Sequence, residues 1–454
     1  MKPIHTLASL CFLSAAFFNV HQPAQADNTE QVKTIKNIQI HPLPGQLDDR
    51  PMLNSNSPEI VEESGILVSS IPGKSPAYLS YPFKGKFGLF SHHIAKDSTP
   101  GERLMYLGTL VSNPGATPVT LELTAGASYL SQPDALFKPL PSLVDNPQGS
   151  IFAGPGDRVT TELLAGTSPL KKQVFTIPAR STQLIASLPV PTNVKILPPI
   201  NGRSTLMYFN ASDNLYVSHL AFFAEKKGGQ FVAPTLEDYR ELLNSGKMAG
   251  KREQAPTNYM REKPQGGFRY GRVAGISQGL TWQSKLFQGD QLLQRPGVGE
   301  TVGYPISAVY LKRMGTDQNQ SGELLRRYPD TAYQNHANYG VRYDIEIPLH
   351  NRTPSYQTYR IGLSHPAAQN KDELTYLFPP NKPVMYRGST RLTWTDEFNQ
   401  KQERLQHVVL QHGQEAQALQ MFTLAPGVNY DVQLSLYYPA DSTPPQLLTV
   451  ERIE

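Results

Sequence analysis

The sequence predicts a mainly β protein: two β-sandwich domains, with an immunoglobulin-like arrangement as one option for each, joined by a mixed segment with one short helix. Three observations lead to this prediction. The apolar runs are short, several of them alternate with polar residues, and turn residues separate them. The chain contains 39 prolines, 34 glycines and 22 tyrosines, a composition typical of many short strands connected by turns.

The first predicted sandwich covers residues 61–225, after an extended, polar and proline-rich lead-in at 27–60. Within it, Val119, Leu121 and Leu123 alternate with polar residues, which predicts a strand with one buried face. The preceding Asn113-Pro114-Gly115 predicts a turn. Other apolar runs that we interpret as strands lie at 66–68, 78–79, 87–90, 104–111, 174–177, 183–188, 204–209 and 215–224.

The second predicted sandwich covers residues 301–454 and repeats this order. An alternating segment at 343–347 is followed by a turn at 351–354, which contains Asn351 and Pro354, and by another alternating segment at 358–363. Later strands are predicted at 374–378, 390–394, 406–410 and 430–437. The recurrence favours two domains of related pattern, although features that all β-sandwiches share would also produce it.

The segment between them, residues 226–300, has a different character. Thr235 is a predicted helix N-cap, Glu237 and Asp238 supply acids for the first turn, and Gly246 ends the helix. The run that follows, residues 247–272, contains seven basic residues and only two acidic ones, Glu253 and Glu262. This run is a candidate site for an anionic surface, although most charged runs are solvated loops. The basic residues are Lys247, Lys251, Arg252, Arg261, Lys263, Arg269 and Arg272.

The first 26 residues have the anatomy of a secretory signal peptide. Lys2 provides a positive charge, an apolar run covers 7–20, and Ala24-Gln25-Ala26 is a small-residue cleavage site before Asp27. The one cysteine, Cys11, lies in the apolar run, so the mature chain is expected to be free of cysteine. Leu10 before it does not fit a lipid-attachment motif, which requires a small residue there.

Composition limits the partners of the mature chain. Removing Lys2 from 42 basic residues leaves 41 against 38 acids, a net charge of +3, which gives no support for nucleic-acid binding. No later apolar run reaches the 18 residues of a membrane-spanning helix. We therefore expect a soluble, exported protein of the periplasm or the extracellular space, without a transmembrane anchor. The oligomeric state stays open.

Two short motifs suggest chemistry but have simpler explanations. Gly275-Ile276-Ser277-Gln278-Gly279 matches the nucleophile elbow of α/β-hydrolases, whose parallel sheet needs alternating helices that this sequence lacks. We expect a glycine-rich turn there, before a strand that contains Trp282. Residues 317–322 resemble the start of a calcium loop, but the closing position holds Tyr328 instead of Glu. A polar surface loop is the expectation.

The histidines and tryptophans are also expected to be structural. His92 and His93 are adjacent, and His407 and His412 are separated by an odd number of residues, so on straight strands each pair points to opposite faces and does not share one metal ion. Trp282 and Trp394 could form a sugar-stacking platform, but core positions are commoner for aromatics in sandwiches. No catalytic residue, metal or cofactor is assigned from the sequence.

Several segments together resemble a family of exported cyanobacterial proteins that is catalogued only as a domain of unknown function. The resemblance extends from about His41 to Val450. It implies a cyanobacterial source and an envelope or extracellular location, and it brings no substrate or site residue. The segments consist mostly of predicted turn and strand-end residues, and they lie at 41–48, 54–59, 65–69, 90–95, 154–158, 339–343 and 438–445.

Two functional hypotheses follow. The first is a non-catalytic component of the cell envelope or extracellular matrix that binds or organises its polysaccharide. The alternative is a secreted carbohydrate-active enzyme with its site between the two domains, where clefts often form. An enzyme predicts a deep cleft with convergent carboxylates or histidines of perturbed pKa, whereas a binding or structural protein predicts flat faces, an aromatic strip or a basic loop.

Overall fold

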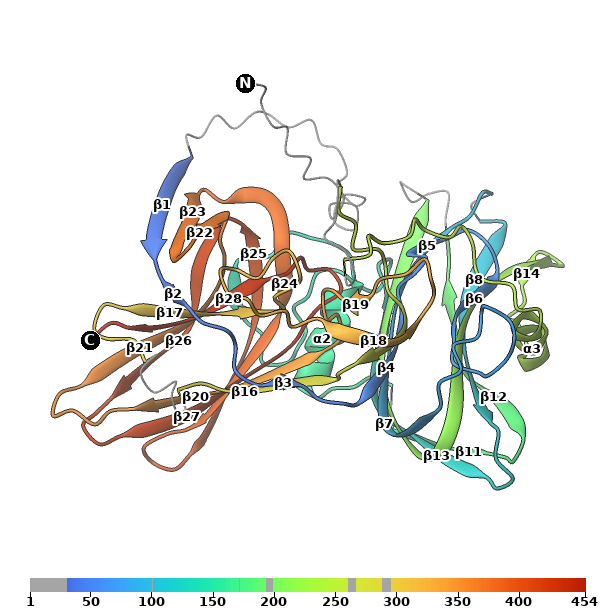
Figure 1. Ribbon diagram of the computed structural model, residues 1–454, viewed down its shortest axis with the longest axis horizontal. Helices are drawn as coiled ribbons and strands as arrows, with labels where there is room; N and C mark the ends of the chain where they lie inside the picture. Colours follow the sequence, from blue (N-terminus) through green and yellow to red (C-terminus); the bar gives the residue numbers. More distant parts are fainter. Residues whose placement is uncertain (1–30, 100, 171, 193–198, 260–266, 288–294) are drawn as a thin grey trace.

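The computed structural model describes residues 31–99, 101–170, 172–192, 199–259, 267–287 and 295–454. Strands dominate these residues, which confirms the mainly β prediction (Figure 1). The two described helices are α2 (Pro155–Ala165) and α3 (Leu236–Asn244). No helix in this part of the chain is long and apolar enough to cross a membrane. The predicted signal peptide, Cys11 included, lies outside the described residues.

A 13-stranded sheet forms one half of the molecule, which we call the large-sheet half (Figure 1, right). Its main strand order is β11-β9-β13-β7-β4-β15-β18-β19. The strands are β4 (Pro51–Ser55), β5 (Ile60–Val61), β6 (Gly65–Ser69), β7 (Phe83–Lys96), β8 (Arg103–Asn113), β9 (Val119–Leu130), β11 (Gln173–Ile177), β12 (Ser181–Val190), β13 (Ile200–Lys227), β14 (Gln230–Phe231), β15 (Ala274–Gln278), β18 (Gly322–Arg327) and β19 (Gln334–Asn335).

The 28-residue strand β13 organises this half. Its first part pairs with β7 and β9, and after a register shift between Ala211 and Leu215 its second part pairs with β8 and β6. The two sets of strands enclose a common apolar cluster that contains Phe87, Leu121 and Val217. One continuous strand therefore connects the two faces that bury this core.

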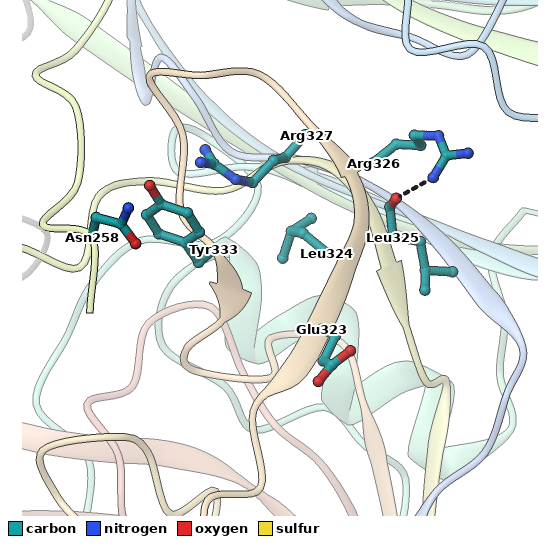
Figure 2. A pocket seen from close by; sticks show the side chains of 7 residues that line it. All are labelled: Asn258, Glu323, Leu324, Leu325, Arg326, Arg327 and Tyr333. Atoms are coloured by element: carbon teal, nitrogen blue, oxygen red, sulfur yellow. Dashed lines mark hydrogen bonds between the residues drawn. The ribbon is translucent and has the colours of Figure 1, made fainter. Parts of the chain in front are cut away.

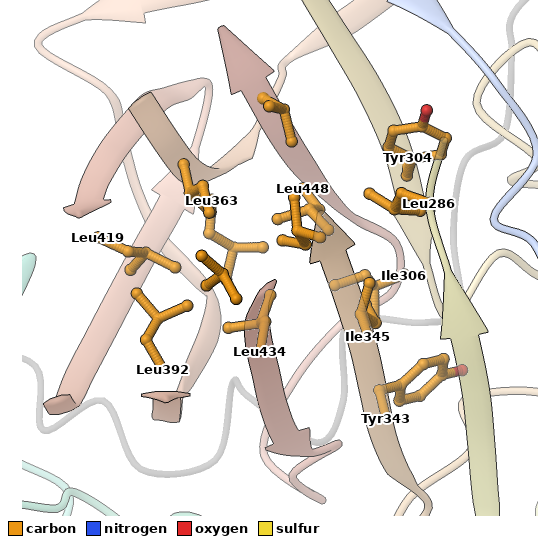
Figure 3. Packing of buried hydrophobic residues seen from close by; sticks show 14 of the residues in the cluster. Leu286, Tyr304, Ile306, Tyr343, Ile345, Leu363, Leu392, Leu419, Leu434 and Leu448 are labelled. Carbon is orange, nitrogen blue, oxygen red and sulfur yellow. The ribbon is translucent and has the colours of Figure 1, made fainter. Parts of the chain in front are cut away.

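A 7-stranded and a 5-stranded sheet form the other half, which we call the two-sheet half (Figure 1, left). Their facing side chains form the largest apolar cluster, which includes Tyr343, Leu434 and Leu448 (Figure 3). The 7-stranded sheet contains β3 (Gln46–Leu47), β10 (Leu143–Asp145), β16 (Thr281–Lys285), β20 (Arg342–His350), β24 (Asn381–Thr395), β25 (Lys401–His412) and β27 (Asn429–Tyr437). The 5-stranded sheet contains β2 (Gln39–Ile40), β17 (Thr301–Ile306), β21 (Gln357–His365), β26 (Gln414–Leu424) and β28 (Gln446–Arg452).

Several segments cross between the halves. The described part of the predicted lead-in is extended, and it pairs with a 3-stranded sheet through β1, with the two-sheet half through β2 and β3, and with the large-sheet half through β4. In the opposite direction, β18 and β19 follow β17 in sequence but join the large sheet. The proposed domain boundaries at 60, 225 and 300 stay a prediction.

The 3-stranded sheet contains β1 (Val32–Asn37), β22 (Ala368–Asn370) and β23 (Glu373–Phe378).

Both predicted asparagine turns are present, and buried amides hold them in the same way. In each turn the amide oxygen accepts a hydrogen bond from the backbone N–H two residues later. The amide nitrogen donates to the carbonyl four residues later and to a carbonyl at the end of a distant strand. The bonds join Asn113 to Gly115, Thr117 and Ile177, and Asn351 to Thr353, Ser355 and Leu424.

The predicted helix after Thr235 is confirmed as α3. Thr235 and Asp238 form a reciprocal capping box, which satisfies two backbone donors at the helix start. Tyr239 anchors the helix on the sheet: its side chain is fully buried, and its hydroxyl lies 2.9 Å from the Ser187 hydroxyl. The ring lies against the backbone of Gly108 in β8, where an added Cβ would overlap it.

Helix α2 was not predicted, because residues 154–158 were interpreted as turn and strand-end residues. The helix lies between the halves and packs on β9, β13, β24 and β27 (Figure 1). Its apolar side chains form a junction core with residues of both halves. The sequence did contain signals for it: Pro155 at the start, Asp157 in the first turn, and Gly166 at the end in the left-handed conformation.

The contact of Tyr239 with Gly108 predicts the effect of a methyl group at that glycine. We expect Gly108→Ala to lower the free energy of unfolding by about 1–3 kcal/mol, because a close-packed core does not accommodate the added volume. Urea denaturation measures the change. Adding Tyr239→Leu removes the ring that the new methyl group would overlap. The double variant should therefore lose less free energy of unfolding than the sum of the losses in the two single variants. Additive losses would contradict the proposed overlap.

Candidate functional site

The predicted basic run does not form one free cationic patch among the described residues. Arg252 makes a bidentate ion pair with Asp330, with nitrogen–oxygen distances of 2.7 and 2.8 Å. Arg272 pairs with Glu59 and lies 3.7 Å from a Glu253 oxygen.

The other members of the run are more loosely held. The Lys247 ammonium lies 3.4 Å from a Glu63 oxygen, Lys251 is exposed, and Arg269 donates to the carbonyl of Ala255. Arg261 and Lys263 lie outside the described residues. Binding of an anionic surface by this run therefore stays a prediction. In the structure, the ion pairs of Arg252 and Arg272 connect this run to Asp330 and Glu59, which are distant in the sequence.

A cleft of about 430 Å³ lies beside this run, along strand β18, and we call it the β18 cleft (Figure 2). Its lining combines two arginines with an amide, a carboxylate, a phenol and two leucines. Figure 2 shows Arg327 next to Tyr333 and Asn258, whereas Arg326 points away from them and donates to the carbonyl of Leu325. The lining residues are Asn258, Glu323, Leu324, Leu325, Arg326, Arg327 and Tyr333.

The cleft has an excess of positive charge, because its lining contains two arginines and one carboxylate, that of Glu323. Arg327 donates from one nitrogen to the carbonyls of Tyr328, Pro329 and Thr331, and neither Arg326 nor Arg327 forms an ion pair within the described ranges. The Arg327 guanidinium lies 3.8 Å from the ring centroid of Tyr333. A guanidinium held over an aromatic ring is a positioned donor group for oxygen-rich ligands.

Tyr333 belongs to an aromatic cluster with Tyr259, Phe268, Tyr270 and Tyr310. The Tyr259 and Tyr310 centroids lie 4.4 Å apart, and the Tyr259 and Tyr333 rings meet edge to face at 5.9 Å. Except for Tyr259, these rings are half-buried. The sequence analysis did not identify this cluster, because its members come from connections that are far apart in the sequence: α3 to β15, β17 to β18 and β18 to β19.

A second cleft of about 340 Å³ lies where the two halves meet, and we call it the junction cleft. Tyr208 of β13 lines it from the large-sheet half, and Arg342 of β20 and Tyr437 of β27 line it from the two-sheet half. No acid or histidine is among its lining residues in the described part of the chain. The full lining is Arg50, Lys86, Phe87, Thr124, Ala125, Tyr208, Phe209, Leu280, Thr281, Arg342 and Tyr437.

Ser277 does not occupy a nucleophile elbow. It lies within strand β15 and not in the turn that we expected, it is fully buried, and its hydroxyl has no hydrogen-bond partner among the described residues. A buried hydroxyl without a base neither reaches nor attacks a substrate. The following strand β16 does contain Trp282, as predicted.

The calcium-like segment is used for structure. The Gln318 side chain accepts from the Leu43 nitrogen and donates to the Leu43 carbonyl, and Gln320 bonds backbone groups of Ser307 and Pro305. No group of three histidine, cysteine, aspartate or glutamate side chains in the described chain is arranged to hold a metal ion.

The paired histidines point to different surroundings, as the strand geometry predicted. His92 bonds the Ser204 hydroxyl at 2.7 Å, whereas His93 bonds the Ser55 hydroxyl at 2.8 Å. In the other pair, His407 contacts helix α2 and His412 contacts Asn381.

Both tryptophans belong to the core of the two-sheet half. Trp282 is 5% exposed and donates to the carbonyl of Pro44. Trp394 packs against the same core and meets Phe422 edge to face. Their positions do not provide a sugar-stacking platform on the surface.

Asp157, at the start of helix α2, is a fully buried acidic residue. Its carboxylate lies 2.7 Å from Nε2 of His407 and accepts from the backbone of Ala153 and the hydroxyl of Thr161. Asp157 and His407 are both fully buried. The Asp441 carboxylate accepts from the backbone nitrogens of Gly156 and Asp157, where the helix dipole favours a negative charge. Burial raises the pKa of Asp441.

We expect Asp157→Asn to lower the free energy of unfolding by about 1–3 kcal/mol, the usual cost of leaving buried hydrogen-bonding groups without a partner, because an amide cannot accept all the bonds that the carboxylate accepts. Asp145→Asn is the matched control, because Asp145 pairs with Arg404 in the same half but is well exposed; it should cost less than about 1 kcal/mol. Equal effects in urea denaturation would show that the helix start does not depend on Asp157.

A second buried network joins two histidines of the large-sheet half. His219 lies between the hydroxyls of Ser91 and Thr109, and its ring stacks on His93 with centroids 5.9 Å apart. Burial lowers the pKa of His219 to about 3. Burial, and then the neighbouring His219, also lowers the pKa of His93.

These shifts predict a stability that falls in acid. Between pH 6.5 and 3 His219 is neutral in the folded chain, whereas in the unfolded chain it binds a proton, so lowering the pH favours unfolding. We expect His219→Gln to reduce the slope of stability against pH in this range by up to about 1 kcal/mol per unit. His350→Gln, near the exposed Asp431, is the control. An unchanged slope in His219→Gln would contradict the assignment.

Comparisons with known proteins support a family assignment. Residues 38–452 match the model of a family described as a protein of unknown function, DUF3370, and the chain therefore belongs to this family. No curated protein matches. Similar solved structures include Bacillus subtilis oxalate decarboxylase (9% identity, 82% of this chain and 78% of that chain, TM-score 0.11), the Macrobrachium rosenbergii nodavirus (10%, 100% and 97%, 0.12) and the CBM22 tandem of Paenibacillus barcinonensis Xyn10C (10%, 86% and 90%, 0.11). Scores this low carry no argument about fold or function.

Proposed function

We propose that this member of the DUF3370 family is an exported, non-catalytic protein of the cell envelope or extracellular matrix that binds anionic polysaccharide at the β18 cleft. The observation that carries the proposal is Arg327, which lies 3.8 Å from the Tyr333 ring centroid in an open cleft and has no carboxylate partner among the described residues. Arginines attract an anionic polymer, and the amide of Asn258 offers bonds to sugar hydroxyls.

The positions of the titratable groups favour binding over catalysis. Asp157, His407 and His219 are buried in hydrogen-bonded networks, away from both clefts. The alternative, a carbohydrate-active enzyme with a site between two domains, needs convergent acids or histidines at the junction. The described lining of the junction cleft offers arginines, a lysine and tyrosines instead, a set suited to holding an anion.

Export and the two-sandwich architecture are parts of the same proposal. We infer that residues 1–26 direct export, with a mature chain that begins at Asp27. We also infer two sandwich domains of related, immunoglobulin-like pattern. The equivalent hydrogen bonds of Asn113 and Asn351 support a common origin, because each follows a long strand and fixes the turn into the next.

The β18 cleft predicts salt-sensitive retention on an acidic polysaccharide. We expect the chain from Asp27 onward to bind alginate beads at low ionic strength and to be released at about 0.5 M salt, which screens the attraction. Arg326→Gln should weaken binding about fivefold, since it removes an exposed positive charge at the edge of the cleft. A sedimentation assay with alginate measures the bound fraction.

Arg352→Gln is the matched control, because Arg352 is exposed in the turn between β20 and β21. It should bind as the wild-type chain does, and neutral dextran should retain neither protein. Equal binding by the two variants, or retention that is insensitive to salt, would contradict the proposed site. Cell fractionation with sequencing of the N-terminus tests export separately: a protein found only in the cytoplasm would overturn that part.

A further inference from the structure

The junction cleft has the features of a binding site for a small organic anion. We propose that it binds a carboxylate carried on an apolar or ring-sized body. This inference does not depend on the polysaccharide proposal, because the two clefts share no residue. The volume of about 340 Å³ lies within the range of small-molecule sites, which combine apolar walls with a few polar groups.

The floor of the junction cleft is aromatic and apolar. Tyr208 and Tyr437 face each other across the junction with ring centroids 6.2 Å apart, and Leu280 lies beside them, 4% exposed. The hydroxyl of Tyr208 donates to the carbonyl of Gly340, so this ring is fixed in place. Two fixed rings and a leucine provide a surface for a flat or apolar ligand body.

The rim of the cleft is cationic. Arg50 pairs with Asp48, and Arg342 donates to Asp344 at 2.9 Å while its guanidinium lies 5.8 Å from the Tyr437 centroid. Lys86 of β7 is exposed and forms no ion pair within the described ranges. The carboxylates of Asp48 and Asp344 balance the charges of the two arginines. The charge of Lys86 is therefore left to attract a ligand anion.

The site is complete only when the halves are joined. Lys86, Ala125 and Tyr208 come from the large-sheet half, whereas Arg342 and Tyr437 come from the two-sheet half. A ligand that contacts both walls binds the assembled state alone, so it should also stabilise the junction against unfolding.

The test is calorimetric titration of the chain from Asp27 onward with benzoate, and with benzamide as its uncharged analogue. We expect saturable benzoate binding and an affinity for benzamide at least about tenfold lower, because the analogue lacks the charge. Glucuronate is titrated as a third ligand. Tighter binding of glucuronate than of benzoate would assign the site to a sugar acid, whereas tighter binding of benzoate would assign it to an aromatic acid.

Two variants locate the site. Lys86→Gln should weaken benzoate binding about fivefold, whereas Lys84→Gln, on the same strand but paired with Asp213 outside the cleft, should have no effect. Ala125→Leu fills the cleft without changing its charge and should abolish binding. Thermal unfolding of each variant without ligand shows whether it folds.

The proposal would be overturned if neither acid showed saturable binding, or if benzoate and benzamide bound equally well. Equal benzoate affinities of Lys86→Gln and Lys84→Gln would also overturn it. If Ala125→Leu fails to fold, the comparison of the two lysine variants decides the question. The Arg326→Gln variant should bind benzoate normally, so failure of the polysaccharide proposal remains distinguishable from failure of this one.

Discussion

The fold depends on the way in which helix α2 is held between the halves. The first N–H groups of a helix have no partner within the helix, and at the start of α2 they lie in the interior. The Asp441 carboxylate accepts a hydrogen bond from one of them, that of Gly156. The Asp157 carboxylate accepts a hydrogen bond from Ala153 in the preceding loop. His407 of β25 then bonds Asp157 inside the junction. Helix α2 contributes to the apolar core that both halves share, and these hydrogen bonds join the helix to both the preceding loop and strand β25.

Both candidate binding surfaces follow from this arrangement. The junction cleft lies where strands of the two halves meet, and the neighbouring tyrosines of β13 and β27 line it. The β18 cleft exists because a strand that follows β17 returns to the large sheet and lies at its outer end. In each case charged side chains surround a rigid aromatic floor or wall, which is an arrangement suited to holding oxygen-rich anions without reorganisation.

The local features of the chain could be predicted from sequence, but its long-range connections could not. Alternation at 119–123 and the Thr235 capping box depend on neighbouring residues, and strand β9 and helix α3 appear where they were predicted. Helix α2 was missed because the strand-rich composition outweighed its proline and glycine signals. The β18 cleft was missed because Asn258 and Tyr333 are 75 residues apart and carry no shared motif. The basic run was visible, but its ion pairs with Glu59 and Asp330 depend on tertiary contacts.

The return of β18 to the large sheet has a consequence for the order of assembly. A chain that leaves the ribosome or a membrane channel N-terminus first presents nearly all strands of the large sheet early, yet β15 lacks its outer neighbour until residue 327 has emerged. During that interval β15 is an open sheet edge, which is a template for pairing with other chains. Long sequence separations between paired strands also slow folding. The large sheet is therefore protected against wrong pairing at this edge only after β18, from much later in the sequence, has paired with β15.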